Sequence, residues 1–416
     1  MSTAKTPSFA SAKQKPNVCL LAFSGGLDTS YCVLHLIERG FSVITASVNT
    51  GGFDAPELER IAALSKQLGA VSHHVIEAQP ELWQNYLRYL LFGNVLRGQM
   101  YPLSVSAERV CQAKCIAELA LEIGASAICH GSTGAGNDQV RFDVAFRTLA
   151  PGVQIITPVR ELALSREFEL SELAKAGVSL PARVGSYSVN VGLWGTSVGG
   201  KETHDSWAHL PEAAYPAGEI AADKALVSIE IGFARGEPCT FKYGPLNAVA
   251  LDPVQLTHKL NQLGASFGIG RGIHLGDTIL GIKGRVGFEA PGAAILIAAH
   301  RELEKLVLSG KQLQFKEGLS NSYGNLLHEG HYFDPLGRDL ESFLISSQAN
   351  VSGEVRLKLR PYHVEVQGVR SPHSLMNSKV ASYGEGASAW SGAEAAGFAK
   401  IYGIAQQISY SRSSAP

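Results

Sequence analysis

The sequence has 416 residues, with 36 Lys and Arg residues against 37 Asp and Glu residues, so its formal net charge at pH 7 is −1. A chain of this length predicts two or three domains with large buried cores. The balanced charge argues against a nucleic-acid-binding protein. The lack of any apolar run of roughly 20 residues argues against a membrane protein.

Residues 1–16 are rich in Ser, Ala and Lys and lack the apolar segment of a secretory signal. We therefore expect a disordered arm at the start of a cytoplasmic protein. The six cysteines are scattered and form no Cys-x-x-Cys pair. This pattern predicts buried, reduced thiols, without disulfides or a protein-bound metal.

Residues 17–180 alternate short apolar runs with stretches of helical periodicity. The expected strands are 18–23, 42–48, 71–76, 125–129 and 155–158, and the expected helices between them are 54–68, 107–123 and 139–149. Strands that are apolar on both faces indicate a parallel sheet covered by helices on two sides. Ligands of such sheets bind at the carboxyl ends of the strands.

The segment at 22–30, Ala-Phe-Ser-Gly-Gly-Leu-Asp-Thr-Ser, links the first expected strand to a helix that opens near Asp28. Its glycines let the backbone approach a ligand, and Ser24, Thr29 and Ser30 supply hydroxyl groups. The first helical turn adds unpaired N–H groups and a positive dipole end, so this layout suits a phosphate. It is neither a Walker A loop nor a dinucleotide fingerprint. It resembles the pyrophosphate loop of ATP pyrophosphatases, enzymes that split ATP between its α and β phosphates.

After about residue 180 the pattern changes. Residues 181–216 are rich in Gly, Ser, Trp and His with little periodicity, which favours a long functional loop. Beyond it we expect strands at 225–232 and around 278–288, helices at 253–267, 295–309 and 320–329, and a hairpin at 353–369. We therefore predict an α+β domain over 181–387.

Residues 388–416 form the last predicted unit. Phe398, Ile401, Tyr402, Ala405 and Ile408 fall on one stripe of a helix expected at 391–409. The stripe packs either on its own subunit or on a neighbouring one, and the sequence leaves both open.

A second glycine-rich run follows the strand expected at 125–129. Residues 130–142 read His-Gly-Ser-Thr-Gly-Ala-Gly-Asn-Asp-Gln-Val-Arg-Phe, and would reach the same rim as the first loop. Here the chain closely resembles the argininosuccinate synthase family, above all in Gly-Asn-Asp-Gln-Val-Arg-Phe. The resemblance continues through 98–103, 281–285, 289–292, 353–357 and 370–372, and covers roughly residues 17–405 in order.

The resemblance implies an AMP-forming C–N ligase of arginine biosynthesis. Citrulline, aspartate and ATP, with Mg²⁺ on its phosphates, would give argininosuccinate, AMP and pyrophosphate through citrullyl-AMP. The implied fold is α/β, with a parallel sheet of the adenine nucleotide α-hydrolase type, a larger α+β synthetase domain and a C-terminal oligomerisation helix. The implied assembly is a homotetramer.

Residues that match the family's motifs inherit expected roles. For ATP these are Ala22, Phe23, Ser24, Gly25, Gly26, Leu27, Asp28, Thr29, Ser30, Val48 and Gly131. For aspartate they are Thr133, Asn137 and Asp138. For citrulline they are Tyr101, Ser106, Asn137, Arg141, Ser188 and Ser197, with Gly276 and Phe288 at two further positions of that site. We expect Asp28, Asn137 and Arg141 to act most directly in the reaction.

Several of these residues also allow a simpler interpretation. Asp28 and Ser30 could only cap a helix. Arg141 could pair with Asp138 or Asp143, and Tyr101 could be a core aromatic. Ser188 and Ser197 could be solvated turn residues.

Three positions depart from the family pattern. Ala135 stands where the family commonly has a lysine, and Lys283 or Arg285 could supply the missing positive charge. Gly276 replaces a glutamate and Phe288 a tyrosine, both at the amino-acid end of citrulline, where Asp277 could restore the negative charge.

These departures leave two alternatives open. One is the same chemistry on a citrulline whose α-amine is acylated, and the other is a non-catalytic nucleotide-binding relative. The scattered cysteines and neutral charge argue against an RNA thiolase, and the lack of a glutaminase-like segment argues against an amidating ligase.

Overall fold

The structure is a computed structural model and describes residues 17–179, 187–221, 223–376 and 389–413. Its N-terminal part is built on a five-stranded parallel sheet with strand order β3-β2-β1-β4-β5. The strands are β1 (Val18–Ala22), β2 (Ser42–Asn49), β3 (Ser72–Glu77), β4 (Ala127–Cys129) and β5 (Gln154–Ile156). All five expected strands are present, and the predicted parallel sheet is confirmed.

Helices cover both faces of this sheet, because its strands alternate apolar side chains between two cores. Cys19 and Leu21 face one core and Leu20 faces the other. The first core is closed by α1 (Leu27–Glu38), α2 (Ala55–Gln67), α7 (Pro158–Glu161) and α8 (Arg166–Lys175). The second is closed by α3 (Gln79–Leu82), η1 (Trp83–Leu87), α4 (Arg88–Phe92), α5 (Ser104–Glu122) and α6 (Asp138–Leu149).

Two antiparallel sheets form the following part of the chain. One has the order β10-β9-β8-β13-β14, and the other has the order β11-β12-β7-β6. Their strands are β6 (Ser188–Asn190), β7 (Thr196–Gly199), β8 (Val227–Ala234), β9 (Glu237–Tyr243), β10 (Val249–Ala250), β11 (Arg271–Asp277), β12 (Lys283–Glu289), β13 (Gly353–Arg360) and β14 (His363–Arg370). The hairpin expected at 353–369 is confirmed. The stretch 181–216, expected as a loop, contains β6 and β7 and two short 3₁₀ helices, η2 (Lys201–His204) and η3 (Glu212–Ala214).

Four helices belong to this part of the chain: α9 (Pro253–Ala265), α10 (Pro291–Val307), α11 (Gly310–Glu329) and α12 (Pro335–Ser347). Helices α9 and α10 pack on strands β9, β13 and β14, whereas α11 and α12 pack on each other and on α5 and α4. Helix α11 starts ten residues earlier than expected, because the N-cap residue Ser309 and Gln312 in the first turn form a capping box. Helix α12 was not expected.

One continuous core joins the N-terminal sheet to the later elements. It contains Leu20 of β1, Ile116 of α5, Leu296 of α10 and Leu359 of β13, all fully buried. Five of the six cysteines are also buried and all six are free, which confirms the expected thiols.

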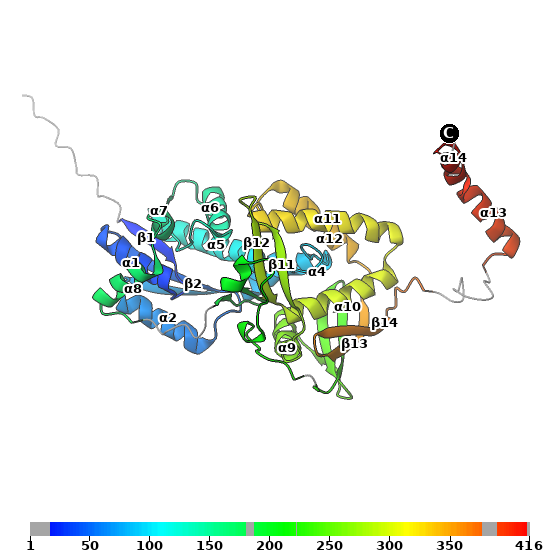
Figure 1. Ribbon diagram of the computed structural model, residues 1–416, viewed down its shortest axis with the longest axis horizontal. Helices are drawn as coiled ribbons and strands as arrows, with labels where there is room; N and C mark the ends of the chain where they lie inside the picture. The colour runs from blue at the N-terminus through cyan, green and yellow to red at the C-terminus, as the bar shows by residue number, and fades with distance from the viewer. Residues whose placement is uncertain (1–16, 180–186, 222, 377–388, 414–416) are drawn as a thin grey trace, which may run out of the picture.

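The C-terminal helices stand apart from the rest of the molecule in Figure 1. The single helix expected at 391–409 is divided at Gly403 into α13 (Gly392–Tyr402) and α14 (Ile404–Ser413). Neither helix has a buried residue, and Phe398, Ile401 and Tyr402 are exposed. The apolar stripe therefore does not pack on the described part of its own chain. No helix among the described residues has the length and apolar character that crossing a membrane requires.

Candidate active site

The first glycine loop connects β1 to α1. Gly25 adopts a left-handed backbone (φ +66°), and a Cβ on it would lie 2.9 Å from Ile61 Cγ1. This position therefore requires glycine on two grounds, backbone conformation and space. Ser24 Oγ and Thr29 Oγ1 are 3.3 Å apart, and Thr29 Oγ1 donates a hydrogen bond to the Gly26 carbonyl oxygen.

The helix that follows this loop has no side-chain cap. Gly26 is its N-cap residue, and neither Asp28 nor Ser30 caps the first turn. The simpler interpretation of these two residues as caps is therefore wrong. Ser30 Oγ is buried and has no hydrogen-bond partner among the described residues. The backbone N–H groups of this turn and the buried Ser30 hydroxyl are therefore available to bind a ligand.

Glu169 of α8 lies beside this turn and was missed by sequence analysis. Burial and then the neighbouring Asp28 raise the pKa of Glu169 to about 7. The two carboxyl groups are close because α8 packs on α1. The local sequence of either helix does not indicate this packing.

The second glycine loop follows β4, which pairs directly with β1. A Cβ on Gly131 would lie 3.2 Å from the Thr29 backbone nitrogen and 3.3 Å from the Asp28 carbonyl carbon. The two loops thus meet at the carboxyl end of the sheet, as the strand pattern predicts. Thr133 and Ala135 are exposed on the second loop, and Val48 is buried near the end of the adjacent strand β2.

Asp138 begins α6 and accepts hydrogen bonds from two arginines. Arg109 Nε lies 2.9 Å from its Oδ2, and Arg141 Nη1 lies 2.9 Å from its Oδ1. Burial alone would raise the pKa of Asp138, but Arg109 and Arg141 together hold it below its usual value. Of the two carboxylates considered for Arg141, Asp138 is therefore its partner. Arg109, on α5, was not expected here.

Asn137 joins the second loop to the turn between β11 and β12. Its Oδ1 accepts a hydrogen bond of 2.9 Å from the Ile279 backbone nitrogen. This contact brings the β11–β12 hairpin to the edge of the parallel sheet. Residues expected to bind aspartate and residues expected to bind citrulline consequently adjoin one another.

Tyr101 is the centre of an aromatic cluster among the residues expected to bind citrulline. Its ring lies 5.2 Å from that of Phe288 and 5.6 Å from that of His274, on which it stacks. Its hydroxyl is 3.4 Å from Ser104 Oγ. The interpretation of Tyr101 as a buried aromatic holds, and the ring nevertheless lies among the expected citrulline residues.

The serines of this region differ in placement. Ser106 and Ser197 are buried, and Ser188 is exposed. Ser197 Oγ accepts from Asn190 Nδ2 at 3.4 Å, and Ser197 pairs with Phe288 across β7 and β12. Ser188 and Ser197 lie on paired strands β6 and β7, so the interpretation of them as turn residues is wrong.

His328 of α11 is a further missed neighbour. Arg141 Nε donates to the His328 carbonyl oxygen at 3.0 Å, and Arg141 Nη2 lies 3.3 Å from its Nδ1. Burial, and then Arg141 and Arg97, lower the pKa of His328 to about 3, so its ring is neutral at pH 7. Arg141 is thereby fixed from two sides.

Lys283 and Arg285, which could replace the positive charge of the family's lysine, both have partners away from the second loop. Lys283 pairs with Asp277 at 2.6 Å, with both side chains largely exposed. Arg285 donates to the backbone carbonyls of Glu202, Asp205 and Ala208, so its guanidinium is bound to residues 202–208 and not to the second loop.

Arg160 of α7 is better placed beside the second loop. A Cβ on Gly134 would lie 3.6 Å from its Cγ, and its Nη1 donates to Gln139 Oε1 at 3.0 Å.

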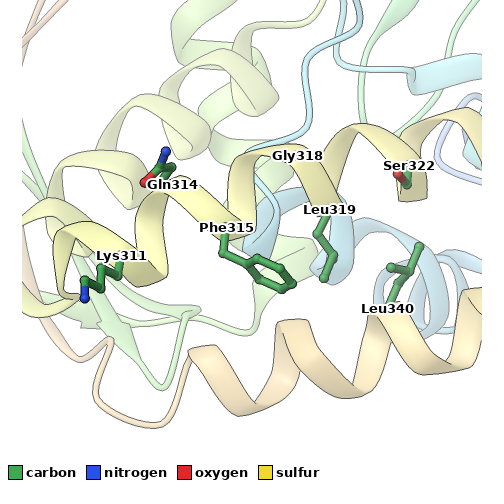
Figure 2. Close-up of a pocket in the computed structure, with 7 residues that line it drawn as sticks. All are labelled: Lys311, Gln314, Phe315, Gly318, Leu319, Ser322 and Leu340. Carbon is green, nitrogen blue, oxygen red and sulfur yellow. The ribbon is translucent and has the colours of Figure 1, made fainter. Parts of the chain in front are cut away.

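Two cavities were found near α11. The first, of about 660 Å³, lies between α11 and α12 around Phe315, Leu319 and Leu340, and contains none of the expected site residues (Figure 2). The second, of about 460 Å³, is lined by Gly276 and His274 and therefore adjoins Tyr101. The second is the cavity that belongs to the candidate site.

Among the described residues, one group of side chains has the spacing of a metal site. The ligand atoms of Glu81, Cys111 and Cys115 lie within 4.8 Å of one another. Lys114 Nζ already pairs with Glu81 at 2.7 Å. None of the residues expected to bind substrate belongs to this group.

Comparisons with known proteins divide the chain into the same two parts, the N-terminal parallel sheet and the later antiparallel sheets. The family model described as the arginosuccinate synthase N-terminal HUP domain matches residues 18–179, and the arginosuccinate synthase C-terminal domain matches residues 187–409. An argininosuccinate synthase of Xanthomonas axonopodis pv. citri is 40% identical over 98% of both chains. Those of Geobacillus kaustophilus (38%, over 94% of this chain and 95% of that protein) and Methanocaldococcus jannaschii (36%, over 88% and 92%) are also similar.

Proposed function

Because the chain belongs to the argininosuccinate synthase family, we propose that it is a ligase that condenses citrulline with aspartate at the expense of ATP. The products are argininosuccinate, AMP and pyrophosphate, and the reaction serves arginine biosynthesis. Mg²⁺ accompanies ATP and neutralises charge on its phosphates. The alternative of a non-catalytic relative has no specific observation in its favour.

The reaction has two steps. The ureido oxygen of citrulline attacks the α phosphorus of ATP, and pyrophosphate leaves. The α-amine of aspartate then attacks the ureido carbon of citrullyl-AMP, and AMP leaves. Both steps depend on alignment and charge stabilisation more than on an activated side-chain nucleophile. The backbone N–H groups of the two loops can stabilise charge on the phosphates, and the arginines are held in fixed positions.

The residues have the following proposed roles. The 22–30 loop, Val48 and Gly131 bind ATP. Thr133, Asn137 and Asp138 bind aspartate, with the Asp138 carboxylate facing the substrate's ammonium group. Tyr101, Ser106, Ser188, Ser197 and Arg141 bind citrulline, and Gly276 and Phe288 border it. Asp138 remains ionised at neutral pH because its pKa is lowered, which suits this role.

The approach of Gly131 to Thr29 is the observation that carries the proposal. A Cβ on Gly131 would be 3.2 Å from the Thr29 nitrogen, so the two loops form one continuous surface of backbone. A single triphosphate can contact both loops at once. The citrulline and aspartate residues lie at the edge of the same surface through Asn137 and the β11–β12 turn.

Product analysis tests the proposal. Purified protein should release AMP and pyrophosphate only when ATP, aspartate and a citrulline-type acceptor are all present. Omitting any one of the three should abolish sustained release, and without aspartate at most one pyrophosphate per active site can form. ADP as the spent nucleotide would overturn the proposal, and ATP binding without any release would favour the non-catalytic relative.

We further propose that the enzyme works in the cytoplasm as a homotetramer. The exposed apolar stripe of α13 and α14 supports self-association, because apolar side chains that the rest of the described chain does not cover leave apolar surface in water.

A further inference from the structure

The cavity of about 460 Å³ beside Tyr101 is larger than the amino end of citrulline requires. Val95, Leu103 and Gly324 form its apolar wall, and Arg97, His274 and Lys283 line it with polar groups. His274 stacks on Tyr101 and so connects the cavity to the citrulline residues. A substituent on the acceptor substrate can therefore extend into this space.

The charges in the cavity do not suit an ammonium group. Arg97 forms no ion pair with any carboxylate in the described part of the chain; its guanidinium donates to Asn325 Oδ1 at 3.0 Å and to the Asp277 carbonyl oxygen at 3.4 Å. The one lining carboxylate, that of Asp277, is already paired with Lys283 at 2.6 Å. A substrate ammonium group would thus meet a positive charge without a free carboxylate.

The side chain of His274 also crowds position 276, where a glutamate would add a carboxylate. A Cβ on Gly276 would lie 2.6 Å from His274 Nε2. His274 is half-buried, and burial and then Arg97 lower the pKa of its ring, so it is neutral at pH 7. The ring that occupies this place can donate or accept a hydrogen bond and carries no charge to balance an ammonium.

We propose that the acceptor substrate is a citrulline whose α-nitrogen carries an acyl group ending in a carboxylate, such as succinyl, and that this cavity holds the acyl group. The proposal rests on the proposed function. Acylation removes the ammonium charge, and the terminal carboxylate gives Arg97 the counter-ion that it lacks. The ureido oxygen still attacks the α phosphorus and aspartate still displaces AMP, so the bonds made and broken are unchanged.

Kinetics with three acceptors test this inference. The kcat/KM of full-length protein is measured with citrulline, N-acetylcitrulline and N-succinylcitrulline, following pyrophosphate release with saturating ATP and aspartate. N-succinylcitrulline should exceed both of the others by at least about tenfold, mainly through a lower KM.

Substitution of Arg97 separates its role from general damage. Arg97→Gln should lower the ratio of kcat/KM for N-succinylcitrulline to kcat/KM for N-acetylcitrulline by at least about tenfold, because only the terminal carboxylate uses the charge. Arg356→Gln is the matched control, since Arg356 is exposed on β13. It should retain the full preference.

A reverse design gives a second readout. Gly276→Glu combined with His274→Ala clears the space that the imidazole fills and adds a carboxylate, which should shift the preference toward citrulline by at least about tenfold.

The possible outcomes are distinguishable. A preference of the unmodified protein for citrulline, or equal use of the acetyl and succinyl compounds, overturns the inference and leaves the proposed function standing. An equal loss for all three acceptors in Arg97→Gln also overturns it, because Arg97 would then bind the α-carboxylate. Failure of every acceptor to give AMP and pyrophosphate would overturn the proposed function itself.

Discussion

Asp138 and Arg141 lie one turn apart at the start of α6, and their side chains form an ion pair with 2.9 Å between Oδ1 and Nη1. Arg109 of α5 occupies the second carboxylate oxygen at the same distance. A carboxylate has about four lone-pair directions, so two remain for a substrate. Two helices thus hold Asp138 ionised and in a fixed orientation before any ligand arrives.

Asp138→Asn should impair the use of aspartate. The variant keeps the shape of the side chain and loses the charge that faces the substrate's ammonium group, so KM for aspartate should rise by at least about tenfold. The KM for ATP should stay within about twofold, because the glycine loops are untouched. Asp339→Asn, an exposed change on α12, is the control. Loss of ATP affinity with unchanged aspartate dependence would contradict the assignment.

Gly131→Ala should impair the use of ATP. The added methyl group would meet Thr29 Cγ2 at 3.1 Å and the Thr29 nitrogen at 3.2 Å, so the two loops must shift relative to each other by a few tenths of an ångström. We expect KM for ATP to rise by at least about tenfold with the melting temperature nearly unchanged. Gly152→Ala, with no atom within 4 Å of its Cβ, should behave as the unmodified protein. If both variants keep the normal KM, the loops do not share the triphosphate.

Glu108→Gln should raise stability at alkaline pH. Glu108 is buried against Gly192, and this burial raises its pKa from 4.5 to about 8, although Arg109 opposes the shift. Between these values the unfolded chain is ionised and the folded chain is protonated. The stability lost by burying Glu108 therefore grows as the pH rises from 4.5 to about 8 and is constant above that.

Thermal melts of the unmodified protein and Glu108→Gln check this sign. The two melting temperatures should be close at about pH 5, and the variant's should be higher by several degrees at about pH 8.5, since one pKa unit corresponds to about 1.4 kcal/mol. A difference that does not change with pH would show that Glu108 titrates normally.

Removal of residues 389–416 should reduce the native mass. The truncation deletes α13 and α14, on which the apolar side chains Phe398, Ile401 and Tyr402 are exposed. Light scattering after size-exclusion chromatography measures the mass. Phe398→Ser with Tyr402→Ser should have the same effect, whereas Lys400→Ser on the same helix should not. An unchanged mass for the truncated chain rules out assembly through these helices.

Local patterns predicted the N-terminal sheet well. Five apolar runs gave five strands, and the loop at 22–30 was recognisable because its glycines, hydroxyl groups and helix start are contiguous. The later part was harder to predict. Strand β11 was missed because it has glycines at 272 and 276, which blur the alternation of apolar and polar residues.

The candidate site was only partly predictable for a related reason. Arg109, Arg97 and His328 reach it from α5, from the segment before Tyr101, and from the end of α11. Their proximity to Arg141 and Tyr101 is produced by the packing of distant elements. No spacing along the chain reveals it.

The core that α5 shares with later parts of the chain also affects synthesis of the protein on the ribosome. Its Ile116 and the Leu20 face of β1 are covered by a core that includes residues as late as Leu359. A nascent chain that has emerged only to residue 179 leaves this face of its first sheet incompletely covered. Apolar surface that stays exposed during synthesis favours aggregation, and we expect this risk to last until the last hairpin has been translated.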